Sequence, residues 1–349
     1  MSRSSRKGEH VHHALSSGNS SADFNDCSLV HQSISHTDYE DINLATSLAG
    51  IALNLPVFIN AMTGGTADTK IINKNLASAA RDAGMALAVG SQMSALEDKH
   101  MRETFQVVRE EYPEGIIFAN IGAYASPEMA MEAVDMLKAA ALQVHLNIPQ
   151  ELIMAEGDRN YKGYLNNIRS MVKSLDVPVI VKEVGFGMSR ETAEKILNCG
   201  VKVLDIGGYG GSNFIRIEAQ RRNIILEEEM MNWGIPTLIS LLEALEAARG
   251  KGEVVASGGI NSAFKMAKSL ALGASAVGMA GLPLSIIQEK GKVEFLRWAR
   301  DLTSSLKQIM VMVGASSINE LRTVPLVIRG KTAEWLDKRG IDTCYLAQR

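Results

Sequence analysis

Cysteine is scarce in this sequence, with three residues of this type among 349. Cys27, Cys199 and Cys344 are odd in number and far apart, which excludes a disulfide framework and a closed zinc site. Free thiols of this kind are typical of a reducing compartment. We therefore expect a cytoplasmic protein.

A large net charge is also missing, since 36 Lys and Arg residues balance 39 Asp and Glu residues. No global field is available to attract nucleic acid or an anionic membrane, so any anion must bind at a local site. The first residues are polar and basic, unlike a signal peptide, and no later apolar run is long enough to span a bilayer. We expect neither nucleic acid nor membrane as a partner.

From Val57 onward, short apolar runs rich in valine and isoleucine alternate with stretches of helix-forming residues. This alternation is typical of a parallel sheet, and eight repeats favour a closed barrel over an open sheet. The predicted fold class is α/β, a single (β/α)8 TIM barrel. Its strand runs are 57–62, 86–91, 116–122, 142–147, 178–185, 201–208, 253–259 and 275–281.

The stretches between the strand runs carry apolar residues at helical spacing, and they open on a polar cap or end at a glycine. The predicted single domain has a barrel core at 51–290 and an N-terminal extension at 1–50. A C-terminal helical extension covers 291–349 and includes a helix from Lys292 to Val313.

Two segments outside the strand repeat are interpreted as moving parts over the barrel mouth. The long loop at 209–235 combines glycines, charges and isolated apolar residues, which suits a lid that orders on ligand binding. A plain surface excursion is the alternative. Near the N-terminus, Arg6 and Lys7 belong either to a disordered basic tail or to an arm that neutralises a substrate diphosphate.

Glycines gather at the ends of the last three predicted strands, on the side where (β/α)8 barrels hold their active sites. Strand seven ends in Gly258-Gly259, strand eight ends in Ala280-Gly281, and strand six is followed by the hydroxyl of Ser212. Backbone N–H groups at glycines can approach a phosphate, and the following helix N-termini add a favourable dipole. A single pair of glycines would be explained by the turn from a strand into a helix. Glycines and a hydroxyl at three adjacent strand ends predict a phosphate site.

Polar groups at the first three strand ends favour a heterocyclic ring beside this phosphate. Strand one ends in Met62-Thr63-Gly64, where the methionine could lie under a ring while Thr63 and the glycine backbone bond its heteroatoms. Strand two ends at Ser91 and Asn120 lies on strand three, so a hydroxyl and an amide could contact a polar ring edge. For each residue alone, a turn without ligand is the alternative.

Lys182 interrupts the apolar run VPVIVKEVG, and a lysine inside a barrel strand is costly to bury without an anion. Beside a reduced flavin its charge would stabilise the anionic ring, whereas in an aldolase-like barrel it would form a Schiff base. A lysine that reaches solvent from the strand end is the third possibility. We favour a functional role.

The segment HLNIPQE brings four polar side chains to one mouth of the barrel. Strand alternation puts His145 and Asn147 on one face, and Gln150 and Glu151 follow directly in the loop. Glu151 is the predicted Mg2+ ligand, because Mg2+ binds through one or two carboxylates together with substrate phosphates. A structural histidine would explain His145 alone, but not the cluster.

The chain closely resembles the type 2 isopentenyl diphosphate isomerases in eight motifs, which occur in the order RKGEH, INAMTGG, GSQMSAL, HLNIPQE, VKEVGFG, DIGGYGGSN, SGGI and GMAG. The glycine motifs recur across FMN-binding barrels, whereas the HLN..QE segment with the RK..H element is far more specific. The resemblance implies interconversion of isopentenyl and dimethylallyl diphosphate without net redox. It implies reduced FMN, Mg2+, NADPH or NADH as reductant, and a homo-oligomer, either a tetramer or an octamer.

Residue by residue, the resemblance assigns FMN binding to nearly every strand end. The positions are Met62, Thr63, Gly64, Ser91, Asn120, Lys182, Ser212, Gly258, Gly259, Ala280 and Gly281. Ser212 stands where the family usually has Thr, which keeps the hydroxyl. Asn261 follows SGGI where some members have Arg, which would weaken one phosphate contact.

The remaining residues belong to the substrate side of the site in this comparison. Arg6 and Lys7 would bind the diphosphate, Gln150 would lie against the reacting allylic portion, and Glu151 would ligate Mg2+. The implied catalytic residues are Gln150, His145, Asn147 and Lys182.

Two rival functions stay open at this point. An FMN-dependent oxidoreductase of the glycolate-oxidase or IMP-dehydrogenase type would share the barrel and the phosphate site. Against it, no cysteine follows a barrel strand as a nucleophile, since Cys199 precedes strand six. A non-catalytic flavin- or phosphate-binding scaffold would leave the polar cluster at 145–151 unexplained.

Overall fold

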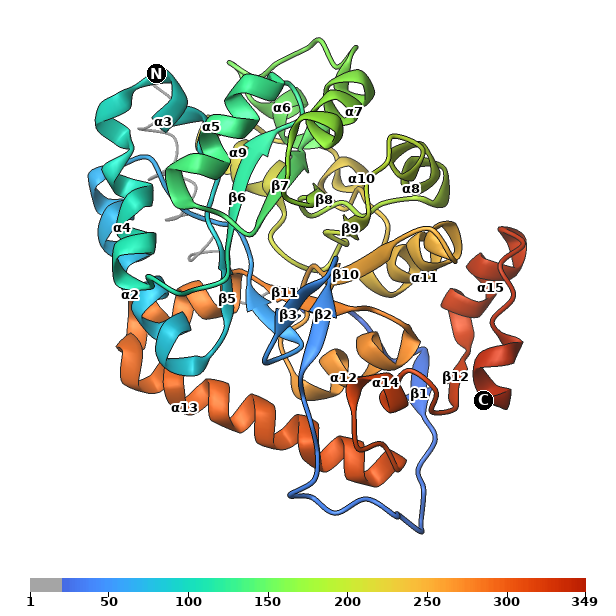
Figure 1. Ribbon diagram of the computed structural model, residues 1–349. Helices are drawn as coiled ribbons and strands as arrows, with labels where there is room; N and C mark the ends of the chain where they lie inside the picture. The colour runs from blue at the N-terminus through green and yellow to red at the C-terminus, as the bar shows by residue number, and fades with distance from the viewer. Residues whose placement is uncertain (1–20) are drawn as a thin grey trace.

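The chain folds around a closed barrel of eight parallel strands in the computed structural model, which describes residues 21–349 (Figure 1). The order around the barrel is β10-β11-β4-β5-β6-β7-β8-β9, and Val57 of β4 pairs with Val277 of β11 to close it. Each strand overlaps one predicted run, so the (β/α)8 prediction is confirmed. The strands are β4 (Val57–Ile59), β5 (Ala86–Ala88), β6 (Ile117–Gly122), β7 (Ala141–Leu146), β8 (Val179–Glu183), β9 (Val203–Asp205), β10 (Glu253–Ser257) and β11 (Ala276–Met279).

Helices surround the barrel, and several begin where the sequence offers a cap. The side chains of Thr66, Ser126, Ser189 and Ser262 each accept a backbone N–H at the start of a helix. The helices are α2 (Ala67–Ala83), α3 (Met93–Glu97), α4 (Glu103–Glu111), α5 (Pro127–Leu137), α6 (Ile148–Ile153), α7 (Tyr164–Ser174), α8 (Arg190–Leu197), α9 (Phe214–Arg222), α10 (Glu228–Met231), α11 (Thr237–Ala248), α12 (Ala263–Leu272), α13 (Gly281–Val313), α14 (Ile318–Leu321) and α15 (Gly330–Lys338).

The helix predicted over 292–313 is the second part of α13. Gly291, with a φ of 77°, separates it from the part that follows β11. Lys292 pairs with Asp82 of α2 at 2.6 Å, and α13 also packs on α12. This helix therefore completes the ring around the barrel, as the long orange helix in Figure 1 shows.

The segment before the barrel closes its N-terminal end. Strands β2 (Thr46–Leu48) and β3 (Ile51–Leu53) form an antiparallel hairpin. Its Leu48 and Leu53 pack against an apolar layer inside the barrel that includes Phe58 and Phe118. Because this end is filled with apolar side chains, a polar site is confined to the opposite end.

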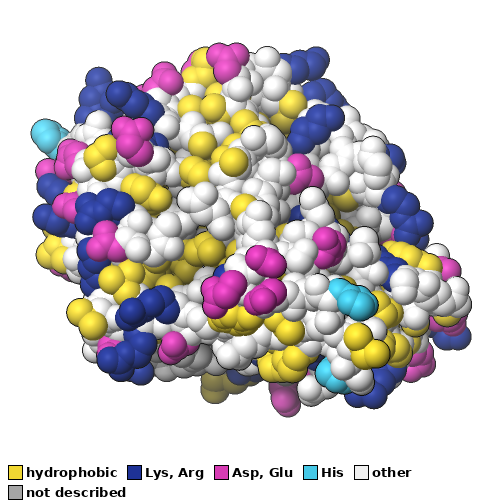
Figure 2. All heavy atoms as spheres, turned by 60° about the horizontal axis from the view of Figure 1, so that its bottom comes forward, with side chains coloured by type: hydrophobic (Ala, Val, Ile, Leu, Met, Phe, Trp, Pro, Cys, Tyr) yellow, Lys and Arg dark blue, Asp and Glu magenta, His cyan; other side chains and the backbone are white. Residues whose placement is uncertain are grey.

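The surface agrees with the balanced composition. On the face in Figure 2, basic and acidic side chains alternate around the rim with apolar side chains between them. Within residues 21–349, no helix combines the length and the apolar character needed to cross a membrane.

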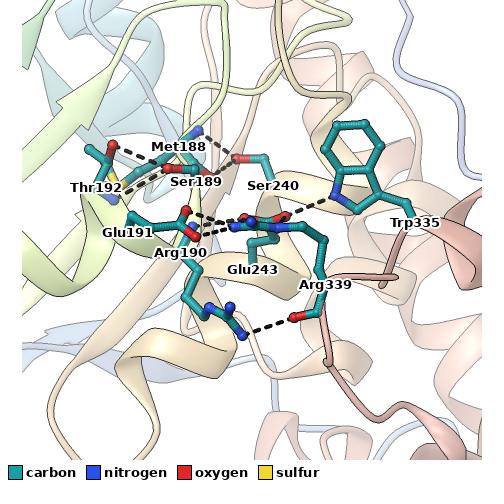
Figure 3. A network of polar contacts seen from close by, with 9 residues as sticks. All are labelled: Met188, Ser189, Arg190, Glu191, Thr192, Ser240, Glu243, Trp335 and Arg339. Atoms are coloured by element: carbon teal, nitrogen blue, oxygen red, sulfur yellow. Dashed lines mark hydrogen bonds and ion pairs between the residues drawn. The ribbon is translucent and has the colours of Figure 1, made fainter. Parts of the chain in front are cut away.

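A polar network, here called the C-terminal clasp, ties α15 to the barrel helices (Figure 3). Trp335 and Arg339 both donate to Glu243 of α11, at 2.8 and 3.0 Å, and Arg339 also pairs with Glu191 of α8. Glu243 is buried, and its other oxygen accepts the backbone N–H of Arg190 at 2.8 Å. The clasp thus fixes the start of α8, immediately after the loop that leaves β8.

Candidate active site

Two adjoining cavities open at the carboxyl ends of the barrel strands. One, of about 340 Å³, is bounded by the ends of β9, β10 and β11, and we call it the glycine-lined cavity. The other, of about 740 Å³, is bounded by the ends of β5, β6 and β7, and we call it the mouth cavity. The two share a wall made of Ala61, Met62, Lys182, Val184 and Phe214.

Backbone segments around the glycine-lined cavity approach too closely for side chains. Gly258 and Gly259 have φ values of 100° and 72°, and a Cβ on either would collide with the backbone of Gly208 or Gly210. Helix α13 begins beside them without a side-chain cap at Ala280. Bare backbone N–H groups and an uncapped helix N-terminus fit a phosphate group. All predicted phosphate contacts line this cavity, namely Ser212, Gly258, Gly259, Ala280 and Gly281.

Asn261 also lines the glycine-lined cavity, and a lysine fixes its orientation. Lys265, in the first turn of α12, donates from Nζ to Asn261 Oδ1 at 2.9 Å. An ammonium only donates, so the amide oxygen must point at Lys265 and the amide NH2 group must point away from it. Burial lowers the pKa of Lys265, while nearby Asp23 raises it. The ammonium group of Lys265 thus contacts Asn261, the position at which some family members have an arginine.

Lys182 is buried between the two cavities, as its place in the sequence predicted. Its Nζ donates to the backbone oxygen of Glu183 at 3.0 Å. Met62 shares the same wall. Thr63 and Gly64 do not line either cavity: the hydroxyl of Thr63 donates to Asn73 at 2.5 Å.

The mouth cavity brings together the predicted polar cluster, since His145, Asn147, Gln150 and Glu151 all line it with Ser91 and Asn120. Asn147 donates to Glu151 Oε1 at 2.8 Å, and the backbone N–H of Asp158 donates to Glu151 Oε2 at 2.8 Å. Gln150 donates to Glu218 at 3.3 Å. Among the described residues, no group of three or more His, Cys, Asp or Glu side chains is arranged around a metal position. A cation at Glu151 would need oxygens from the substrate.

Four buried polar residues at or below the floor of the cavities had no predicted role in the site: Asn60, Gln143, Asp205 and Ser257. Gln143 could have been found, because it lies two residues before His145 and so faces the same side of β7. Ser257 donates to Asp205, which accepts from Asn60 at 2.7 Å. A Cβ on Gly278 would collide with the amide of Asn60, so the glycine makes room for this network.

Glu183 holds the loop that follows β8. Its Oε2 accepts the backbone N–H groups of Phe186 and Gly187 at 2.6 and 3.1 Å. Burial raises the pKa of Glu183 to about 8, against the lowering effect of these N–H groups and of Lys182. The loop is thereby fixed next to Lys182 at one end, as the C-terminal clasp fixes it at the other.

The predicted lid at 209–235 contains α9 and α10. Phe214, at the start of α9, lines both cavities, and Asn213 donates to the backbone oxygen of Met231 at 2.7 Å, which ties the two helices together. Movement of this segment stays a prediction. Arg6 and Lys7 lie outside the described residues.

Comparison with known proteins gives close relatives over the full length. The chain is 49% identical over 345 residues to an isopentenyl-diphosphate delta-isomerase of Geobacillus sp. (strain WCH70), covering 98% of each chain. It is 47% identical to the protein of that name from Moorella thermoacetica, covering 97% of each chain. For the Staphylococcus saprophyticus protein of that name, the identity is 42%, over 97% of this chain and 98% of the other.

More distant comparisons point to the same barrel. A family model described as FMN-dependent dehydrogenase matches residues 143–327. Among solved structures, a mandelate oxidase variant with (S)-mandelic acid is similar with a TM-score of 0.65 at 16% identity, covering 93% of this chain and 95% of the other. At that identity the likeness concerns the fold alone.

Proposed function

Since the chain belongs to the family of isopentenyl-diphosphate delta-isomerases, we propose that it interconverts isopentenyl diphosphate and dimethylallyl diphosphate at the barrel mouth, on a bound FMN. The observation that carries this proposal is the 49% identity to a protein of that name over 98% of both chains. The enzyme is an isomerase. The oxidoreductase alternative has only the partial match at 143–327 in its favour.

The two cavities fit FMN and a second molecule side by side. We assign the phosphate of FMN to the glycine-lined cavity, with Ser212, Gly258, Gly259, Ala280 and Gly281 around it. The ring would lie toward Met62 and Lys182, with Ser91 and Asn120 at its polar edge. Thr63 and Gly64 could contribute only through the backbone, because the hydroxyl of Thr63 is used by Asn73. Reduced FMN would supply a ring nitrogen that gives and recovers a proton, and an electron-rich face beside developing positive charge.

The chain's own residues must orient the substrate and keep its reacting carbons dry. Binding of the diphosphate at one end converts binding energy into orientation of the alkene at the other. Glu151 would hold Mg2+ together with diphosphate oxygens, and Arg6 and Lys7 would add positive charge. Gln150, His145 and Asn147 would contact the allylic portion from the wall of the mouth cavity.

Two further points rest on the family resemblance alone: NADPH or NADH would reduce the flavin, and the protein would assemble as a tetramer or an octamer. A location in the cytoplasm is proposed from the few, widely spaced cysteines. The substrate we propose is the small-molecule diphosphate.

A direct test combines flavin loading with product analysis. The protein is loaded with FMN, reduced without oxygen and mixed with isopentenyl diphosphate and Mg2+ in deuterated water. Dimethylallyl diphosphate carrying deuterium should appear in the NMR spectrum, and the oxidised protein should give none. No isomer, together with flavin reduction by a 2-hydroxy acid, would favour the oxidoreductase instead.

A further inference from the structure

A continuous series of side-chain hydrogen bonds crosses the barrel interior at the floor of the two cavities. It runs from Asp205 on β9 to Asn60 after β4 at 2.7 Å, and from Asn60 to Gln143 on β7 at 3.0 Å. It continues from Gln143 to Asn120 on β6 at 3.1 Å, and ends at Nδ1 of His145, 2.9 Å from Asn120. The four members from Asp205 to Asn120 are at most 2% exposed, so water has little access to them.

Asp205, at the acidic end, sets the donor-to-acceptor direction of this series of hydrogen bonds. A carboxylate only accepts hydrogen bonds, so Asn60 must turn its Nδ2 toward Asp205 and its Oδ1 away. The backbone N–H of Ala61, which only donates, reaches the same Oδ1 at 2.8 Å and fixes Asn60 from a second side. Gln143 can then meet that oxygen only with its Nε2.

The orientation of Asn60 in turn fixes the orientations of Gln143, Asn120 and His145. With Nε2 of Gln143 used, its Oε1 accepts from Nδ2 of Asn120, and Oδ1 of Asn120 is the atom left for the histidine. An amide oxygen cannot donate, so the proton in this last bond belongs to His145 Nδ1. We infer that Asp205, acting through three amides, holds the proton of His145 on Nδ1, so that the neutral ring carries its lone pair on Nε2.

This inference rests on the proposed function for its chemical meaning. His145 lines the mouth cavity, where the allylic portion of the substrate would lie. A ring fixed with its lone pair on Nε2 can accept a proton or a hydrogen bond there, but in the neutral form it cannot donate one from that atom. Asp205 and Gln143 line neither cavity, so they are positioning residues for His145.

The test reads the tautomer directly. FMN-loaded protein labelled with 15N in histidine would be examined by NMR, with the signals of His145 identified by their loss in His145→Gln. In the wild type, Nδ1 should give the shift of a protonated ring nitrogen and Nε2 that of an unprotonated one. Gln143→Leu breaks the chain in the middle, frees the Asn120 amide to turn over, and should give a mixture of the two tautomers.

Two variants test whether the tautomer of His145 depends on the direction of the hydrogen bonds or only on the packing of a buried amide. Gln143→Glu supplies a buried carboxyl group that can donate to Asn60 from its protonated oxygen and accept from Asn120 with the other, so it should keep the proton of His145 on Nδ1. Gln92→Leu removes an equally buried amide that binds the backbone N–H of the same Asn120 at 2.9 Å, and it should leave the tautomer unchanged.

Some results would overturn the inference. One is a proton on Nε2 in the wild type, which decides the matter even if the variants do not fold. Another is an unaltered tautomer in folded Gln143→Leu. The readout needs no turnover, so failure of the proposed isomerase activity would be seen separately.

Discussion

Lys182 on β8 lies in register with His145 on β7, and both side chains line the mouth cavity from neighbouring strands. An ammonium group at this place is a positive charge in the wall that the two cavities share. It favours negative charge on anything bound between them. The pair therefore suits a site in which an electron-rich ring lies against Lys182 and His145 faces the same bound molecule.

Replacement of Lys182 tests this arrangement. Lys182→Ala should weaken FMN binding and lower the reduction potential of the bound flavin, because the reduced, anionic ring loses its counter-charge. A loss of about 1.4 kcal/mol corresponds to a shift of about 30 mV for a two-electron couple. Potentials measured against reference dyes would show the change.

Lys182→Arg, which keeps the charge, should restore part of this potential. A Schiff-base role predicts a different outcome: arginine would rescue nothing, and borohydride would trap a carbonyl substrate on the wild type. A potential that stays the same in Lys182→Ala would reject the role assigned here.

Glu151→Gln should retain FMN but lose most of the activity, by roughly a hundredfold or more, since a neutral amide is a poor Mg2+ ligand. Calorimetric titration of Mg2+ in the presence of inorganic diphosphate would report the lost site without turnover. The matched control is Glu156→Gln, because Glu156 lines the same cavity but pairs with Arg221 at 2.8 Å. Equal Mg2+ binding by wild type and Glu151→Gln would remove Glu151 from the metal site.

Lys265→Met should weaken FMN binding about three- to tenfold, as expected for one hydrogen bond that is no longer oriented. Binding of riboflavin, which lacks the phosphate, should not change. Asn261→Ala should have a similar effect, and the double variant should lose little more than either single one. Fluorescence titration measures both affinities, and Lys268→Met on the same helix serves as the control. If riboflavin binding fell in parallel, Lys265 would have no specific effect on the phosphate.

Arg339→Ala should destabilise the fold by about 3 kcal/mol, because it leaves the buried carboxylate of Glu243 without its cation. Urea unfolding measures the loss. Arg297→Ala breaks an exposed pair with Glu294 and should change stability by less than about 1 kcal/mol. Equal losses of unfolding free energy in the two variants would show that the C-terminal clasp stabilises the fold no more than an exposed ion pair does.

Two of the buried glutamates, Glu243 and Glu183, predict opposite effects of pH on stability. Burial raises the pKa of Glu243, but the bonds from Arg339 and Trp335 outweigh it and the net shift is downward. Its contribution is thus present above its unfolded pKa and lost as pH falls through the folded value. Glu183, with a pKa raised to about 8, holds its proton more tightly when folded, so it should reduce stability as pH rises from its unfolded value toward 8.

Glu183→Gln isolates this second effect. The variant cannot ionise, so its stability should fall less than that of the wild type between pH 5 and pH 8, as followed by urea unfolding. Parallel curves for the two proteins would mean that Glu183 is ionised throughout this range.

The strands could be predicted because each is an apolar run between polar helices, and β7 also revealed its inward face through His145 and Asn147. Gln143 shares that face, yet only the closed barrel shows that it meets Asn60 and Asn120 from other strands. Such contacts depend on register between distant segments, which local patterns do not contain.

The contacts of Thr63 and Lys265 could not be predicted from the sequence for a similar reason. A hydroxyl next to a strand end has the same pattern whether it faces a ligand or, like Thr63, a helix residue such as Asn73. In the sequence, Lys265 looks like any lysine in a helix. Its role depends on the turn that brings its ammonium group to Asn261.

The pairing of β1 (Cys27–Leu29) with β12 (Leu326–Ile328) constrains the order in which the chain can assemble as it is made. Synthesis proceeds at about 5–20 residues per second, so β1 leaves the ribosome roughly 15–60 seconds before its partner, about 300 residues later. The pairing of the buried Cys27 with Ile328 is therefore missing through most of translation. Ribosome-bound chains that stop before residue 326 lack this pairing, and we expect the thiol of Cys27 to be more open to alkylation in them than in the full-length chain.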